Sequence, residues 1–101
     1  MYIRGWDDTI TLSSGAGQTI IIDEFNGLEL LQIITSPSNE NAIYNIEILN
    51  TDFNLLVFER AVQGKFNEII NFPCYGHNTF RIRNANPATG TVIVALRFRV
   101  P

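Results

Sequence analysis

Few residues in this chain could carry chemistry. The sequence has one cysteine and one histidine, Cys74 and His77, and their spacing could place a thiol and an imidazole on one turn. A catalytic thiol needs such a base and also a third group that orients the base. No third group is evident, and Pro73 and Gly76 indicate a loop between strands. We therefore expect a buried or half-buried thiol, a surface imidazole and no catalytic residues.

Metal and phosphate sites are equally poorly supported. Cys74 and His77 supply two ligands, whereas a structural zinc site takes four. The acid pairs Asp7-Asp8 and Asp23-Glu24 lack the alternating oxygen ligands and the glycine of a calcium loop. The Gly15-Ala16-Gly17 loop lacks the lysine and the following helix of a phosphate-binding loop. A glycosidase-type carboxylate pair depends on distance in three dimensions, and nothing in the sequence favours one. We predict no enzyme activity, no cofactor and no metal.

The composition is that of one globular domain. The chain has 101 residues, 46% of them apolar and 17% charged, which suits a single domain over residues 1–101. A lone cysteine excludes an intrachain disulfide and is typical of a protein folded in a reducing compartment. We expect no signal peptide and no transmembrane segment, because neither a cationic start before an apolar run nor an apolar run of membrane length is present.

Alternating apolar and polar residues predict β-strands throughout. Turn residues interrupt the chain at intervals of about 8–12 residues, which is typical of a β-sandwich or barrel. The strands are expected near Asp8–Leu12, Gln18–Asp23, Leu28–Thr35, Ala42–Asn50, Leu55–Ala61, Lys65–Phe72, Asn78–Asn84 and Thr91–Val100. Only Leu55–Gln63 could also pass as helical. The pattern predicts an all-β fold, a two-layer antiparallel sandwich of about eight strands, with either jelly-roll or immunoglobulin-like strand order.

Two finer expectations concern the second half of the chain. The apolar spacing in Lys65–Phe72 breaks strict alternation, which a bulge near Glu68 would explain. The last two strands are expected to pair as a hairpin, which would line one sheet surface with four guanidinium groups, Arg81, Arg83, Arg97 and Arg99. Like charges repel across strands, so acids must lie between them. Glu47, Glu59 and Glu68 are favoured slightly over acids from another subunit.

Charge and aromatic residues indicate surfaces for contact. Residues 1–50 hold seven acids and one base, and residues 51–101 hold three acids and six bases. Two faces of opposite sign would suit docking, and an ordinary solvated surface is the plainer alternative. A net charge of −3 with one lysine argues against nucleic-acid binding. Phe25 and Phe53 lie at predicted loop tips, where aromatics either anchor interfaces or fold back over the sandwich end. The interface candidates are Trp6, Phe25, Phe53, Arg81, Arg83, Arg97 and Arg99.

Two stretches, Ala42–Arg60 and Phe80–Val100, resemble the hairpins of small β-sandwich accessory proteins of the decoration type on tailed-bacteriophage virions. The resemblance implies a structural protein that binds the outside of a capsid in many copies and stabilises it through protein–protein contacts. It implies capsid or other virion proteins as partners and a possible homo-oligomer. From charge and hydropathy we expect no nucleic acid and no membrane as partners. It also implies synthesis in the host cytoplasm and a final place in the virion.

Two alternatives stay open. The first is a carbohydrate-binding module or adhesin, in which Tyr2, Trp6 and Tyr75 would stack against sugars. The second is a phage tail or connector component.

Overall fold

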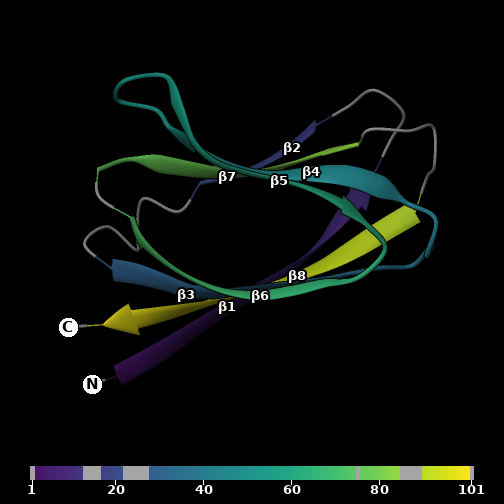
Figure 1. Ribbon diagram of the computed structural model, residues 1–101, viewed down its shortest axis with the longest axis horizontal. Helices are drawn as coiled ribbons and strands as arrows, with labels where there is room; N and C mark the ends of the chain where they lie inside the picture. The colour runs from purple at the N-terminus through teal and green to yellow at the C-terminus, as the bar shows by residue number, and fades with distance from the viewer. Residues whose placement is uncertain (1, 13–16, 22–27, 75, 85–89, 101) are drawn as a thin grey trace.

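The computed structural model describes residues 2–12, 17–21, 28–74, 76–84 and 90–100, and these residues form two facing antiparallel sheets (Figure 1). The strands are β1 (Tyr2–Leu12), β2 (Gly17–Ile21), β3 (Leu28–Pro37), β4 (Ile43–Asn50), β5 (Leu55–Gln63), β6 (Phe66–Cys74), β7 (Asn78–Asn84) and β8 (Gly90–Val100). The predicted all-β sandwich is confirmed. The ambiguous segment Leu55–Gln63 is a strand, and the described residues contain no helix that could span a membrane.

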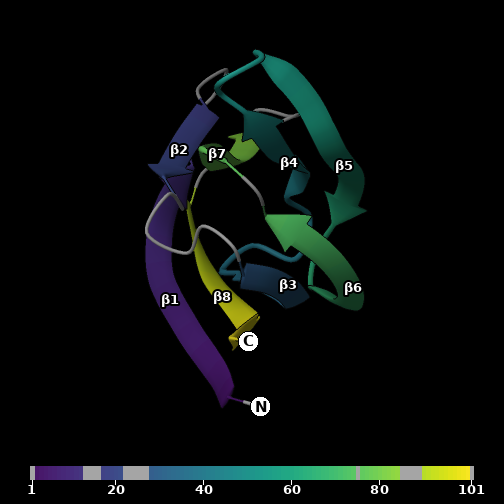
Figure 2. The same ribbon diagram turned by 90° about the vertical axis from the view of Figure 1, so that its left-hand side faces the viewer.

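The strand order decides between the two predicted topologies. One sheet has the order β1-β8-β3-β6 and the other β2-β7-β4-β5. The first strand therefore pairs with the last, the second with the seventh, the third with the sixth and the fourth with the fifth. This nested pairing is the strand order of a jelly roll. In Figure 2, β5 and β6 lie at one side of the sandwich, and β1 and β2 at the other.

The predicted hairpin of the last two strands is wrong. β7 lies between β2 and β4, whereas β8 lies between β1 and β3 in the other sheet. β7 and β8 belong to different sheets because each pairs with its own nested partner, β7 with β2 and β8 with β1. Arg81 and Arg83 are therefore on one sheet, and Arg97 and Arg99 on the opposite one, so no common row of four guanidinium groups forms.

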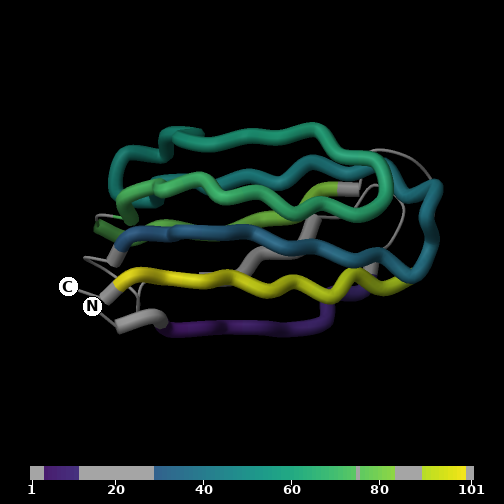
Figure 3. The backbone as a smooth tube through the Cα atoms, turned by 60° about the horizontal axis from the view of Figure 1, so that its bottom comes forward, coloured from purple at the N-terminus to yellow at the C-terminus, as the bar shows by residue number. Residues whose placement is uncertain are grey.

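The first strand is longer than predicted. It begins at Tyr2, not near Asp8, and pairs with β8 from Tyr2↔Val100 to Leu12↔Gly90. Residues 2–7 include Gly5 and Asp7 and lack a clear apolar alternation, so their extended form comes from the partner strand. Figure 3 shows β1 and β8 running side by side, with the chain ends at the same end of the sandwich.

The predicted bulge is present in β6, slightly beyond Glu68. Leu30 pairs with Phe72 and Gln32 pairs with Ile69, so β6 has one more residue than β3 in this interval. Asn71 lies in that interval with a φ of 47°, a left-handed conformation that asparagine tolerates better than most residues. Exposure nevertheless alternates along the whole of β6, and Phe66, Ile70 and Phe72 all pack against the core. The alternation that was expected to break therefore holds, and β3 also shifts register against β8 between Leu30 and Gln32.

The core lies between the two sheets. Its largest fully buried side chains come from both layers: Tyr44, Phe80, Phe98, Leu30, Ile33, Ile46, Ile48, Ile82, Leu96 and Val92. On the side of the sandwich where β5 and β6 are the edge strands, the rings of Phe58 and Phe72 contact each other, with centroids 6.0 Å apart. The ion pair Arg60 Nη2–Glu68 Oε1, at 3.4 Å, spans the same side.

A buried hydroxyl network joins the two sheets. The Tyr44 hydroxyl on β4 donates to the Gly64 carbonyl at 2.6 Å and lies 2.6 Å from the Thr35 hydroxyl on β3. Since tyrosine has one hydroxyl proton, Thr35 is the donor in the second bond. Gly64 also donates its N–H to the Ala42 carbonyl at 3.0 Å, so the turn between β5 and β6 is fastened to the start of β4.

Candidate functional site

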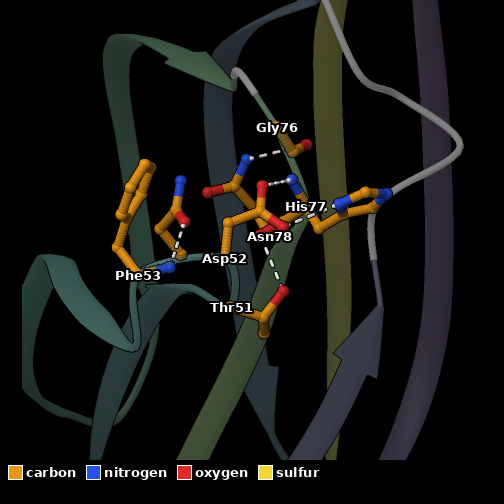
Figure 4. Close-up of polar contacts among 7 residues, drawn as sticks. Thr51, Asp52, Phe53, Gly76, His77 and Asn78 are labelled. Carbon is orange, nitrogen blue, oxygen red and sulfur yellow. Dashed lines mark hydrogen bonds and ion pairs between the residues drawn. The ribbon is translucent and has the colours of Figure 1, made fainter.

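The loop between β4 and β5 is held against the connection between β6 and β7. The N–H and hydroxyl of Thr51 both donate to the His77 carbonyl, at 2.9 and 3.0 Å. The Asp52 carboxylate accepts the His77 N–H at 3.2 Å and lies 2.9 Å from His77 Nδ1 (Figure 4). We call this set of contacts, made by Thr51, Asp52, Gly76 and His77, the loop clasp.

Local sequence explains the shape of the clasp. The Asn50 side chain accepts the Phe53 N–H at 3.2 Å, a turn that asparagine forms readily. Asn54 completes the turn with a φ of 50°. Gly76 has a φ of +72°, and a Cβ there would lie 2.8 Å from Asp52 Oδ2. Only glycine therefore lets the two loops approach this closely without a shift of the carboxylate.

The clasp joins two exposed side chains, a carboxylate and an imidazole. Hydrogen bonds from the His77 side chain and then from its backbone lower the pKa of the Asp52 carboxyl. Asp52 is consequently a carboxylate at neutral pH, and it orients the His77 ring through Nδ1. The His77 side chain is 58% exposed, as the sequence predicts.

No nucleophile completes a catalytic arrangement at this pair in the described part of the chain. Cys74 is buried, and desolvation raises its pKa to about 11, so it is a neutral thiol at physiological pH. A thiol in that form is a poor nucleophile. The described residues also contain no cluster of three His, Cys, Asp or Glu side chains that could hold a metal ion.

The clasp presents an apolar surface. Phe53 is 79% exposed, and Leu55 and Leu56, which follow it at the start of β5, are 57% and 41% exposed. The Phe53 ring points away from the polar contacts of the clasp (Figure 4). β5 is an edge strand, so among the described strands only β4 forms a ladder with it. We call Phe53, Leu55 and Leu56 the tip surface.

The other aromatic candidates behave differently. Trp6 lies opposite Leu96 on the inner side of β1 and packs, half-buried, against the core. Part of its ring is therefore used in packing within the domain. Phe25, Tyr75 and the side chain of Tyr2 lie outside the described residues. The alternative that loop-tip phenylalanines fold back over the sandwich is wrong for Phe53.

The strand arginines are neutralised mainly within the chain. Arg81 Nε donates to Glu47 Oε1 at 2.8 Å, and Arg83 Nε lies 3.9 Å from the same oxygen. Glu47 was among the expected acids. Arg99 instead pairs with Glu29 at 3.5 Å, its direct neighbour across β8 and β3. Among the described residues, Arg97 has no carboxylate within ion-pair distance.

A comparison with solved structures supports this fold. The crystal structure of Yersinia pseudotuberculosis-derived mitogen (YPM) matches with a TM-score of 0.59 and 14% sequence identity, over 94% of this chain and 84% of that chain. At this identity the likeness concerns the fold alone. No protein-family description matches the sequence, and no curated protein sequence matches it.

The clasp could not be predicted from the sequence, and the tip surface could be predicted only in part. Thr51-Asp52-Phe53-Asn54 reads as a hairpin loop, and the exposure of Phe53 follows from its place there. The contact of Asp52 with His77 joins residues 25 positions apart, which no local pattern reveals. Leu55 and Leu56 gave no signal, because an apolar strand start is expected to face the core.

Proposed function

We propose that this protein is a structural accessory protein that binds the outer surface of a phage capsid through the tip surface. The observation that carries the proposal is Phe53, a large aromatic side chain that is 79% exposed on a loop fixed by four hydrogen bonds. A binding role for this surface requires no catalytic group. It supplies apolar contact area at a defined position.

A rigid apolar tip suits protein binding for an energetic reason. Ordering a mobile side chain or loop on association costs free energy, about 0.5–1.5 kcal/mol for each immobilised side chain. The clasp removes most of that cost for the loop before binding. Aromatic anchors of this kind contribute a large share of the binding energy in protein interfaces, so Phe53 is the expected centre of the contact.

The identity of the partner rests on the resemblance to virion accessory proteins. The stretch Ala42–Arg60, which carries part of that resemblance, contains β4, the clasp residues Thr51 and Asp52, and the whole tip surface. A capsid exterior offers many identical sites, so even a small contact per copy adds to the stability of the shell. YPM is a mitogen by name, and its similarity to this chain gives no support for that activity here.

The test measures whether the protein copurifies with phage heads. An antibody against the recombinant chain is used to probe density-gradient fractions of a phage lysate from the source, with tails and DNA-filled heads separated. We expect the chain in the head fraction at a fixed ratio to the major capsid protein. Its presence only among free proteins, or only with tails, would overturn the capsid assignment.

A variant series locates the contact. Recombinant Phe53→Ser, added to heads stripped of the native chain, should bind about 30-fold more weakly than the unaltered chain, which corresponds to the loss of about 2 kcal/mol expected for an anchor residue. Ile43→Ser is the matched control, because Ile43 is also an exposed apolar residue, at 38%, but lies at the start of β4, outside the tip surface. Equal binding by Phe53→Ser and the control would contradict the assigned surface.

A further inference from the structure

The outer face of the β1-β8-β3-β6 sheet carries a second unusual surface. Leu96 and Ile33 point into the core, so the residues beside them in sequence, Arg97 and Ile34, point outward. The register then fixes rows across the sheet. One row is Ile69, Gln32, Arg97 and Gly5, the next is Asn67, Ile34, Ala95 and Asp7, and the third contains Ser36, Ile93 and Thr9.

An apolar diagonal crosses these rows. Ile69 on β6 is 69% exposed and Ile93 on β8 is 55% exposed. Ile34 and Ala95, both half-buried, lie between them. The diagonal runs across the middle of an open sheet face, where solvated strands of a sandwich ordinarily carry polar residues. This distribution indicates a covered face.

Two opposite charges, Arg97 and Asp7, lie along one side of the diagonal. Among the described residues, Arg97 and Asp7 form no ion pair, whereas Arg81, Arg83 and Arg99 all do. Arg97 lies opposite Gly5, and nothing lies within 4 Å of the position that a Cβ would take at Gly5. The guanidinium of Arg97 therefore has open space beside it on this face.

The arrangement of these residues is self-complementary. Ile93 lies two strands and two rows away from Ile69. Asp7 lies one strand and one row away from Arg97, in the same direction. The line from Ile69 to Ile93 and the line from Arg97 to Asp7 are therefore parallel. With strands about 4.8 Å apart and rows about 6.8 Å apart, the Arg97 and Asp7 positions are separated by about 8 Å. A two-fold axis in the plane of the face, across this direction, would bring Ile69 onto Ile93 of a second copy and Arg97 onto its Asp7.

We infer that two copies of this chain associate through this face, with the isoleucine diagonal in the centre and two symmetric Arg97–Asp7 ion pairs at the rim. An interface about a two-fold axis must be self-complementary, and this face supplies both signs of charge in matching positions. Four strands of about ten residues give a face of about 600 Å² per copy, about 1,200 Å² in total, which is at the lower limit for a specific interface. A dimer that forms at micromolar concentration is expected.

The dimer leaves the tip surface free, because Phe53, Leu55 and Leu56 belong to the β4–β5 hairpin of the other sheet. The inference is therefore independent of the proposed function, and its test uses different variants. Failure of Phe53→Ser to affect capsid binding would leave the dimer unaffected, and a monomeric chain would leave the capsid proposal unaffected.

The experiment is sedimentation velocity of the full chain from about 1 to about 200 µM, a range that brackets a micromolar dimer. We expect a concentration-dependent shift from monomer to dimer. Charge reversal by Arg97→Asp or by Asp7→Arg should each weaken the dimer about tenfold or more, because both create like-charge contacts across the interface. The double variant Arg97→Asp/Asp7→Arg should restore it.

Ile43→Ser, on the opposite sheet, is the control and should dimerise like the unaltered chain. Urea unfolding of each variant, followed by Trp6 fluorescence, identifies any variant that is misfolded. Ile93→Ser provides a second, uncharged disruption of the centre. A chain that is monomeric across the whole range overturns the inference, and so does a dimer that tolerates both single charge reversals and Ile93→Ser.

Discussion

Replacing Tyr44 with phenylalanine tests whether the buried hydroxyl network holds the two sheets together. The Tyr44 side chain and the Thr35 hydroxyl are buried, and the Tyr44 hydroxyl is within 2.6 Å of both Gly64 O and Thr35 Oγ1. Tyr44→Phe keeps the ring and removes one oxygen atom. The Gly64 carbonyl then loses its side-chain donor, and the Thr35 hydroxyl loses its acceptor.

The magnitude follows from the cost of buried, unpaired polar groups. Each such group costs about 1–3 kcal/mol, so two groups in an otherwise unchanged core give a loss of about 2–6 kcal/mol. A domain of this size has about 5–15 kcal/mol of stability in total. A loss near the lower end of the range for two groups leaves the variant folded at room temperature, with a melting temperature at least about 8 °C lower, since about 1 kcal/mol shifts the midpoint of such a domain by about 4–8 °C.

Urea unfolding provides the assay. Trp6 is the only tryptophan and packs against the core, so its fluorescence reports the loss of the sandwich. We expect the urea midpoint of Tyr44→Phe to fall by at least about 0.7 M with an unchanged slope, given a loss of at least about 2 kcal/mol and a slope of about 1–3 kcal/mol/M for a small protein.

A double-mutant cycle separates the network from general packing. Thr35→Val alone removes one bond and leaves the bond from Tyr44 to Gly64, so it should be milder than Tyr44→Phe. The combined variant should be more stable than the sum of the two single effects predicts, by about 1 kcal/mol. A loss below about 0.5 kcal/mol for Tyr44→Phe, or strict additivity in the cycle, would refute the reasoning.

Two further predictions concern titrating groups. The pKa of Asp52 is lowered in the folded state by its hydrogen bonds from His77, so its contribution to stability is present above the unfolded value of about 3.9 and is lost as the pH falls below it. The urea midpoint of Asp52→Asn should therefore decline less between pH 7 and about pH 2.5 than that of the unaltered chain, and equal declines would contradict the clasp. Native Cys74, buried with a pKa of about 11, should react with an aromatic disulfide reagent at about pH 8 far more slowly than the urea-unfolded chain; equal rates would show that the thiol is accessible.

Strands were predictable wherever the signal is local. β7 has the predicted bounds, Asn78–Asn84, because Phe80 and Ile82 alternate with polar residues and both are fully buried. The first half of β1 was missed because its extended form comes from β8, more than 80 residues away in the register. Alternation fixes which side of a strand faces the core, and it contains no information on which strand lies beside it.

The same division explains the sites. Arg81 and Arg99 were each assigned correctly to an outward position, but their partners depend on sheet order. Glu47 neutralises Arg81 as expected, whereas Glu29, which pairs with Arg99, could be recognised only once β3 and β8 were known to be neighbours. Phe53 was recognised from the turn residues around it, and the clasp that fixes it required the distant His77.

The nested pairing of the jelly roll has a consequence for how this chain reaches its native state. The outermost pair, β1 with β8, joins residues from Tyr2↔Val100 inward, so the longest possible chain separation must be closed to complete one sheet. Among the described strands, only β4 and β5 pair with each other and also follow each other directly in sequence. Domains dominated by such distant contacts fold in about milliseconds to seconds, far more slowly than helical bundles of similar size. During synthesis, β1 cannot pair with β8 until β8 has left the ribosome. The β1-β8-β3-β6 sheet is therefore completed only after nearly the whole chain has been made.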